Sequence, residues 1–105
     1  MSDQAYIRVS IAKDFSDVPG PRWIKEGPNS GEEFYHRLLR PRFQHALDSK
    51  VKLFIDLDDT AGYATSFLEE SFGNLSIEYG PGTVLQNIIL KSDDEAFLTE
   101  EIEGI

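Results

Sequence analysis

The chain has 105 residues, 40% of them hydrophobic, and this length and composition suit one small globular domain spanning residues 1–105. Ten Lys and Arg stand against 19 Asp and Glu, a net charge of −9, and cysteine is absent. The absence of cysteine excludes a disulfide framework, a thiolate metal site and a cysteine nucleophile, and the acidic surface disfavours nucleic acid as a partner. No apolar run exceeds four residues, so we expect no membrane-spanning segment and a cytoplasmic location.

The negative charge is concentrated in the second half of the chain. Residues 1–53 hold nine bases and seven acids, whereas residues 54–105 hold twelve acids and a single base, Lys91. A surface divided in this way complements a basic patch on a protein partner.

The first third of the chain predicts a strand and then a long loop. In residues 6–12, Ile7, Val9 and Ile11 alternate with other residues, which is the pattern of a half-buried strand. Residues 14–31 contain three prolines and three glycines and are typical of a loop. We expect Trp23 and Ile24 to anchor this loop to the core.

A helix and a central strand follow. Ser30 and Glu33 form a capping-box pattern that predicts a helix from Gly31 to about Asp48, with a kink or break at Pro41. The nearly continuous apolar run of residues 51–57 predicts a buried central strand.

The second half predicts two more helices around a third strand. A helix begins near Thr65 or Ser66 and ends at Gly80 and Pro81, although Gly73 leaves open a shorter helix with a strand at 75–79. Residues 84–90 predict a strand. A capping box at Ser92 opens a last helix, with Phe97, Leu98 and Ile102 on its apolar face. This alternation predicts an α/β fold, a small mixed sheet with helices mainly on one face.

One motif points to phosphotransfer chemistry. The apolar strand ends in Asp56-Leu57-Asp58-Asp59-Thr60, which resembles the first motif of the haloacid dehalogenase-like phosphatases. That resemblance implies Asp56 as nucleophile and Asp58 as general acid and base beside Mg²⁺. The alternative interpretation is an acidic turn that ends a buried strand.

A second resemblance covers more of the chain. An apolar strand leads into an acidic turn and then to a serine at a helix N-terminus. Further matching strings lie at Gly20-Pro21-Arg22, at residues 30–34 and at residues 62–73. Together these features resemble the bacterial STAS-like family, a domain family of unknown function related to the anti-sigma factor antagonists. This resemblance implies a non-catalytic regulatory module, without a cofactor, that binds a protein partner such as a kinase-like ATPase or an anti-sigma-type factor. In the signature of the anti-sigma factor antagonists, Ser66 falls on the phosphoacceptor, while Ala64 and Phe67 depart from the flanking residues.

Ser66 therefore has two open interpretations, a helix N-cap or, with Thr65 as its neighbour, a phosphoacceptor whose phosphate would lie at the positive end of a helix dipole. We expect the partner-binding surface at the turn of residues 58–65 and the start of the following helix. Its candidate contact residues are Arg22, Asp58, Asp59, Tyr63, Phe67 and Glu70, with Tyr63 and Phe67 as apolar anchors. No residues are expected to form a metal site.

Overall fold

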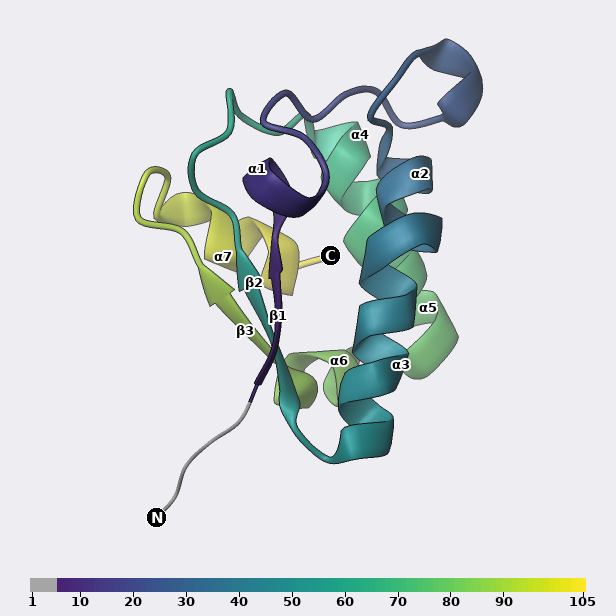
Figure 1. Ribbon diagram of the computed structural model, residues 1–105, viewed down its shortest axis with the longest axis vertical. Coiled ribbons are helices and arrows are strands. Elements are labelled where there is room, and N and C mark those ends of the chain that lie inside the picture. The colour runs from purple at the N-terminus through teal and green to yellow at the C-terminus, as the bar shows by residue number, and fades with distance from the viewer. Residues whose placement is uncertain (1–5) are drawn as a thin grey trace.

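The computed structural model describes residues 6–105, in which one three-stranded sheet lies beside a layer of helices (Figure 1). The strands are β1 (Tyr6–Ser10), β2 (Lys52–Asp56) and β3 (Ile88–Lys91). The α-helical elements are α1 (Ile11–Asp14), α2 (Gly31–Phe34), α3 (Arg40–Ser49), α4 (Thr65–Leu68), α5 (Asn74–Tyr79), α6 (Pro81–Asn87) and α7 (Phe97–Glu103). The other helical turns are the 3₁₀ turn η1 (Ile24–Glu26) and the π-helical turns η2 (Tyr35–Leu39) and η3 (Glu69–Gly73).

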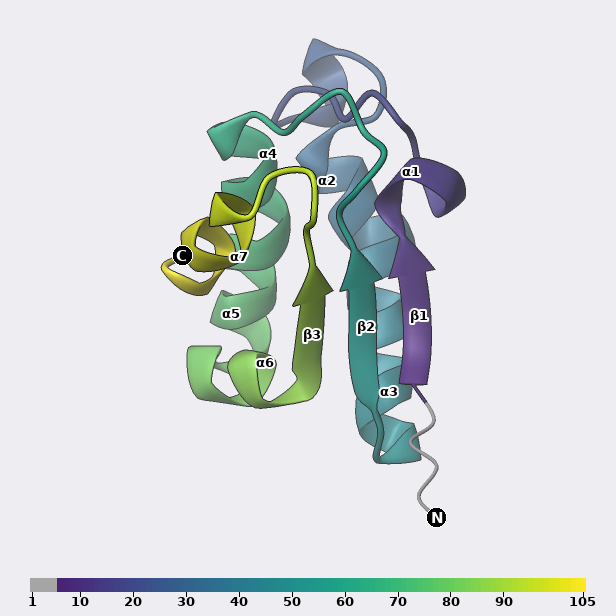
Figure 2. The ribbon, with the colours of Figure 1, turned by 90° about the vertical axis from the view of Figure 1, so that its left-hand side faces the viewer.

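The sheet order is β1-β2-β3, and both strand pairs are parallel. Each connection is a helical crossover that moves one strand along in the same direction, and right-handed crossovers of this kind place their helices on the same face. Figure 2 shows this arrangement, with the strands toward the viewer and α2 and α3 behind them. The α/β class and the one-sided helix layer are thus confirmed, but the described strands are all parallel, whereas the sequence predicts a mixed sheet.

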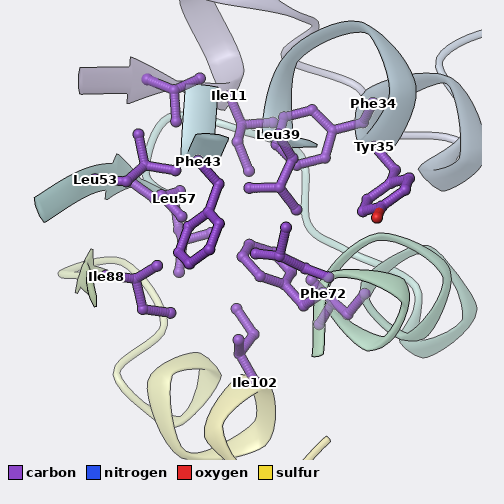
Figure 3. Close-up of a cluster of buried hydrophobic side chains, with 14 of the residues drawn as sticks. Ile11, Phe34, Tyr35, Leu39, Phe43, Leu53, Leu57, Phe72, Ile88 and Ile102 are labelled. Atoms are coloured by element: carbon purple, nitrogen blue, oxygen red, sulfur yellow. The ribbon is translucent and has the colours of Figure 1, made fainter. Parts of the chain in front are cut away.

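The core lies between the sheet and the helices (Figure 3). Val9, Leu53 and Ile55 point from β1 and β2 toward the helices and are almost wholly buried. Aromatic and aliphatic side chains of the helices face them, and the centres of the stacked Phe34 and Phe67 rings lie 5.7 Å apart. Burial of these large side chains, each contributing about 1.5–3 kcal/mol, holds the helix layer on the sheet.

Two predicted strands are shorter in the structure than in the sequence pattern. Residues 11 and 12 belong to α1, because the Ser10 hydroxyl accepts the backbone N–H of Lys13 and starts a helical turn. Residues 84–87 lie in α6, where Pro81 occupies the first turn and the Asn87 amide donates to the Thr83 carbonyl. The predicted strand at 84–90 is therefore wrong in its first half, while the central strand is confirmed.

The first long helix runs without a break through α2, η2 and α3, from Gly31 to Ser49. Its predicted N-cap is confirmed, since the Ser30 hydroxyl accepts the Glu33 N–H at 2.9 Å. Pro41 does not end the helix. The π-helical turn η2 directly precedes it, and such a widened turn accommodates a residue that lacks an N–H donor.

The second long helix runs through α4, η3 and α5, from Thr65 to Tyr79, so the alternative strand at 75–79 is wrong. Gly73 lies in the π-helical turn η3. Gly80, at φ 91°, separates this helix from α6, as its predicted role as a stop requires.

Two apolar expectations are wrong. Trp23 and Ile24 are 38% and 54% exposed, because backbone hydrogen bonds such as that from the Gly31 N–H to the Pro21 carbonyl hold the loop and leave these side chains outside. In the last helix Leu98 and Ile102 are buried as predicted, but Phe97 is 59% exposed. Within residues 6–105 no helix is both long and apolar enough to cross a membrane.

Candidate functional site at the carboxyl edge of the sheet

The carboxyl ends of β2 and β3 meet at one edge of the sheet, where Asp56 and Lys91 are paired in register. We call the residues Asp56, Asp58, Asp59, Asp93 and Asp94, with Lys91, the acidic edge. Because the loops that follow the parallel strands converge at this edge, it brings together residues that are far apart in the sequence.

Asp58 is the most constrained of these residues. Its side chain is 6% exposed and accepts three hydrogen bonds, from Lys91 Nζ at 2.5 Å and from the backbone N–H groups of Asp93 and Asp94 at 3.0 and 2.9 Å. The Asp94 amide and the Lys91 ammonium are the main causes that lower the pKa of Asp58 to about 2. Asp58 thus joins the turn after β2 to the loop after β3 and has no carboxylate oxygen free for a partner.

Lys91 is the cation at the centre of the acidic edge. Besides Asp58, its ammonium lies 3.2 Å from Asp93 Oδ2 and 3.9 Å from Asp56 Oδ1. The hydrogen bond to Asp58 is the largest of the causes that raise the pKa of Lys91. The role of Lys91 is missing from the sequence prediction, although the chain carries a signal for it, because residues that end neighbouring parallel strands lie side by side.

Asp56 and Asp59 remain more accessible. Asp56 Oδ1 accepts the Asp58 N–H at 2.9 Å, a local turn, and its side chain is 30% exposed. Asp59 is exposed, has φ 69° and donates its N–H to Asp94 Oδ2 at 3.0 Å. These two carboxylates, with those of Asp93 and Asp94, form the accessible negative surface of the edge.

Among residues 6–105, no three or more His, Asp or Glu side chains are grouped so that they could hold a metal ion.

The start of α4 differs from the sequence prediction. The N-cap is Ala64, which has no capping side chain, so Ser66 is the second helical residue and not the predicted cap. Thr65 is exposed and donates from its hydroxyl to Glu101 Oε2 of α7 at 3.3 Å, while Ser66 is partly exposed. Both candidate phosphoacceptors thus reach the surface at the first turn of the long helix.

Of the two predicted apolar anchors, Phe67 is buried and Tyr63 is partly buried. Phe67 is 0% exposed and packs among other rings in the core, so its assignment to the binding surface is wrong. Tyr63 is half-buried, its hydroxyl donates to the Leu57 carbonyl at 2.8 Å, and burial raises its pKa. The spacing of Phe67 from Leu68 and Phe72 indicates a helix with apolar residues, but it does not show whether Phe67 faces the core or the solvent.

Arg22 and Glu70 are paired with each other instead of being free. The Arg22 guanidinium hydrogen-bonds Glu69, lies 3.6 Å from Glu70 Oε1 and stacks 5.7 Å from the centre of the Trp23 ring. Glu70 also accepts the Asn74 side-chain amide at 2.7 Å. These contacts tie the loop of residues 14–31 to η3 beside the start of the long helix.

Taken together, the single parallel sheet, the helices on one of its faces and the hydroxyl-bearing helix start after the central strand define a small α/β domain. The chain belongs to the family described as "STAS-like domain of unknown function (DUF4325)", whose model matches residues 30–96, more than half of the chain. The match covers the central strand, both long helices, β3 and the acidic edge. No curated protein and no solved structure matches the chain.

Proposed function

We propose that this STAS-like domain is a non-catalytic cytoplasmic interaction module, resembling an anti-sigma factor antagonist, that binds a protein partner through the acidic edge and the first turn of α4. The observation that carries the proposal is the exposed Thr65 hydroxyl, which lies with that of Ser66 at the positive end of a helix that directly follows the acidic edge. A partner with a basic patch would engage the accessible carboxylates beside these hydroxyls.

Phosphorylation of Thr65 or Ser66 would supply a switch for such a surface. A phosphate adds nearly two negative charges, and at Thr65 it would stand against the Glu101 carboxylate that this hydroxyl now contacts. Repulsion between the phosphate and Glu101 would disturb the contact between α4 and α7 and so change the shape of the surface that the partner binds. A kinase-like ATPase is the partner class that fits this chemistry.

The phosphotransferase alternative has less support. Its general acid and base, Asp58, would have to leave three hydrogen bonds in order to exchange protons, and its pKa of about 2 keeps it ionised at neutral pH. The structural role of Asp58 accounts for these contacts without catalysis.

Affinity capture of the tagged full chain from its own cells tests the proposal. We expect the wild type to retain a protein with a kinase-like ATP-binding domain in roughly equimolar amount. We expect Thr65→Asp to lose about 90% of it, because a carboxylate at residue 65 repels Glu101 and disturbs the first turn of α4; a tenfold loss of affinity corresponds to about 1.4 kcal/mol. The matched control is Thr83→Asp, on the exposed surface of α6, which should capture normally. Equal capture by all three chains, or turnover of an aryl phosphate that Asp56→Asn abolishes, would contradict the proposal.

A further inference from the structure

The face of the sheet turned away from the helices is not covered by any element of residues 6–105, and Figure 2 shows it directly. This arrangement is uncommon, because parallel sheets are usually covered on both faces. Since side chains alternate along a strand, the residues between the buried ones lie on this side. We define the open face by Tyr6, Arg8, Lys52, Phe54 and Ile89. Asp56 and Lys91 end the strands on the same side, where their charged groups lie 3.9 Å apart.

The centre of the open face is a cation held between aromatic rings. Arg8, Phe54 and Ile89 form one row across the three strands, in register. The Arg8 guanidinium lies 4.9 Å from the centre of the Phe54 ring and 5.7 Å from that of Tyr6. Arginine and aromatic side chains preassembled in this way are the groups that dominate binding energy at protein interfaces.

The charge of the open face is opposite to that of the molecule. Arg8 and Lys52 are exposed, and neither forms an ion pair with any residue of the described chain. Arg22, Arg37, Arg40, Arg42 and Lys91 all lie within ion-pair distance of an acid. Among the described residues the other cations without an ion pair are Lys13, Lys25 and Lys50, which lie outside the sheet. In a protein of net charge −9, the open face therefore presents two cations beside an apolar strip.

From this complementarity we propose that the open face binds an acidic amphipathic segment of another protein, with carboxylates against Arg8 and Lys52 and apolar side chains on Phe54 and Ile89. The area argues for one segment and against a stable dimer. Three strands about 4.8 Å apart and up to about five residues long cover roughly 14 by 17 Å, or about 240 Å², well below the ~800 Å² per partner of a stable interface. One helix or extended peptide matches that footprint.

Selection of a displayed library of random peptides against the full chain tests this surface without assuming a sequence. We expect the selected peptides to combine Asp or Glu with Leu, Ile or Phe. Their binding should weaken about tenfold on Lys52→Glu and on Arg8→Glu, as at interface hot spots. The matched control is Lys25→Glu, an exposed lysine of η1 outside the sheet, which should change binding less than about twofold.

Amide chemical shifts of the full chain then locate the peptide. We expect the largest changes at Arg8, Phe54 and Ile89, with little change at the acidic edge. If Arg8→Glu unfolds the chain in a thermal melt, Lys52→Glu alone decides the outcome. Selected peptides without acidic enrichment, or binding that survives Lys52→Glu, would overturn the proposal. Single-stranded RNA binding that Phe54→Ala abolishes, or self-association that Lys52→Glu abolishes, would also overturn it, by assigning the face to another occupant.

Discussion

Asp58 illustrates how one residue can carry the signature of a catalytic site while serving the fold. Asp58 follows the central strand in a phosphatase-like motif, yet its carboxylate accepts hydrogen bonds from Lys91 and from two backbone amides. A buried carboxylate with three donors stabilises the folded state because it remains ionised there.

Asp58→Asn should lower the free energy of unfolding at pH 7 by about 2 kcal/mol, because the hydrogen bonds and ion pair lose their charge. The pKa of Asp58 is lowered, from 3.8 to about 2, so its contribution is present above about pH 4 and is lost as the pH falls toward 2. The wild type and the variant should therefore converge in urea unfolding at low pH. Asp59→Asn is the control, since Asp59 is exposed and asparagine tolerates its positive φ. Equal stability of the Asp58 and Asp59 variants at pH 7 would show that Asp58 is not the tie between the two loops.

For two phenylalanines, the observed burial is the opposite of the burial that the sequence predicts. Phe67, predicted as a surface anchor, is 0% exposed, and Phe97, predicted as part of an apolar helix face, is 59% exposed. Phe67→Ala should cost about 3–5 kcal/mol of stability, the usual loss for a large core side chain, while Phe97→Ala should cost less than about 0.5 kcal/mol. Thermal unfolding of the two variants measures the difference, and similar melting temperatures would contradict this placement of the core.

At the scale of elements, the two long helices lie close to each other where α2 and α4 begin. A Cβ atom at Gly31 would lie 2.6 Å from the Phe67 carbonyl oxygen, a contact that a folded chain cannot hold without a shift of one helix. The glycine in the capping sequence is therefore required by packing, in addition to the Ser30 cap.

Gly31→Ala should destabilise the protein by about 1–3 kcal/mol through this overlap. Gly82→Ala is the matched control in α6, because a Cβ atom added at Gly82 would meet no other atom within 4 Å and alanine favours the helix. We expect that control to be neutral or stabilising in chemical denaturation. A Gly31→Ala protein as stable as the wild type would mean that the helices do not meet at this point.

The helices and strands also show which features of the fold a sequence pattern can predict and which it cannot. The Ser30 cap, the central strand and the two long helices were predictable, since capping and hydrophobic periodicity are local signals. The π-helical turn before Pro41 and the start of α6 at Pro81 were not, because a proline after a helical run can equally end it, be absorbed by a wider turn or start the next helix.

In the candidate site, the sequence predicts which residues lie there but not which side chains contact one another. The motif places Asp56 and Asp58 at the carboxyl end of the central strand, and the structure agrees. That Lys91 neutralises Asp58, and that Arg22 pairs with Glu69, depends on which strands and loops become neighbours. Such long-range pairs are set by the topology of the sheet and not by any window of sequence.

At the scale of the whole molecule, the uneven charge is partly balanced by contacts between the halves. Arg22 binds Glu69, and Arg40 binds Glu78 through two hydrogen bonds of 2.8 and 2.9 Å. Glu78 also accepts the Tyr35 hydroxyl, so this contact joins η2 to α5. After these pairings the acidic edge keeps exposed carboxylates at Asp59, Asp93 and Asp94, while the exposed Arg8 and Lys52 lie on the open face of the sheet.

Hydrogen exchange of the full chain, alone and with its captured partner, tests whether the partner binds at the acidic edge and the first turn of α4, because exchange reports which backbone amides a partner covers. We predict slower exchange in residues 58–70, which span the turn after β2 and the start of the second long helix, and we expect Thr65→Asp to remove this protection. Unchanged exchange in residues 58–70, in a complex that forms with full occupancy, would contradict the account and move the partner surface elsewhere on the domain.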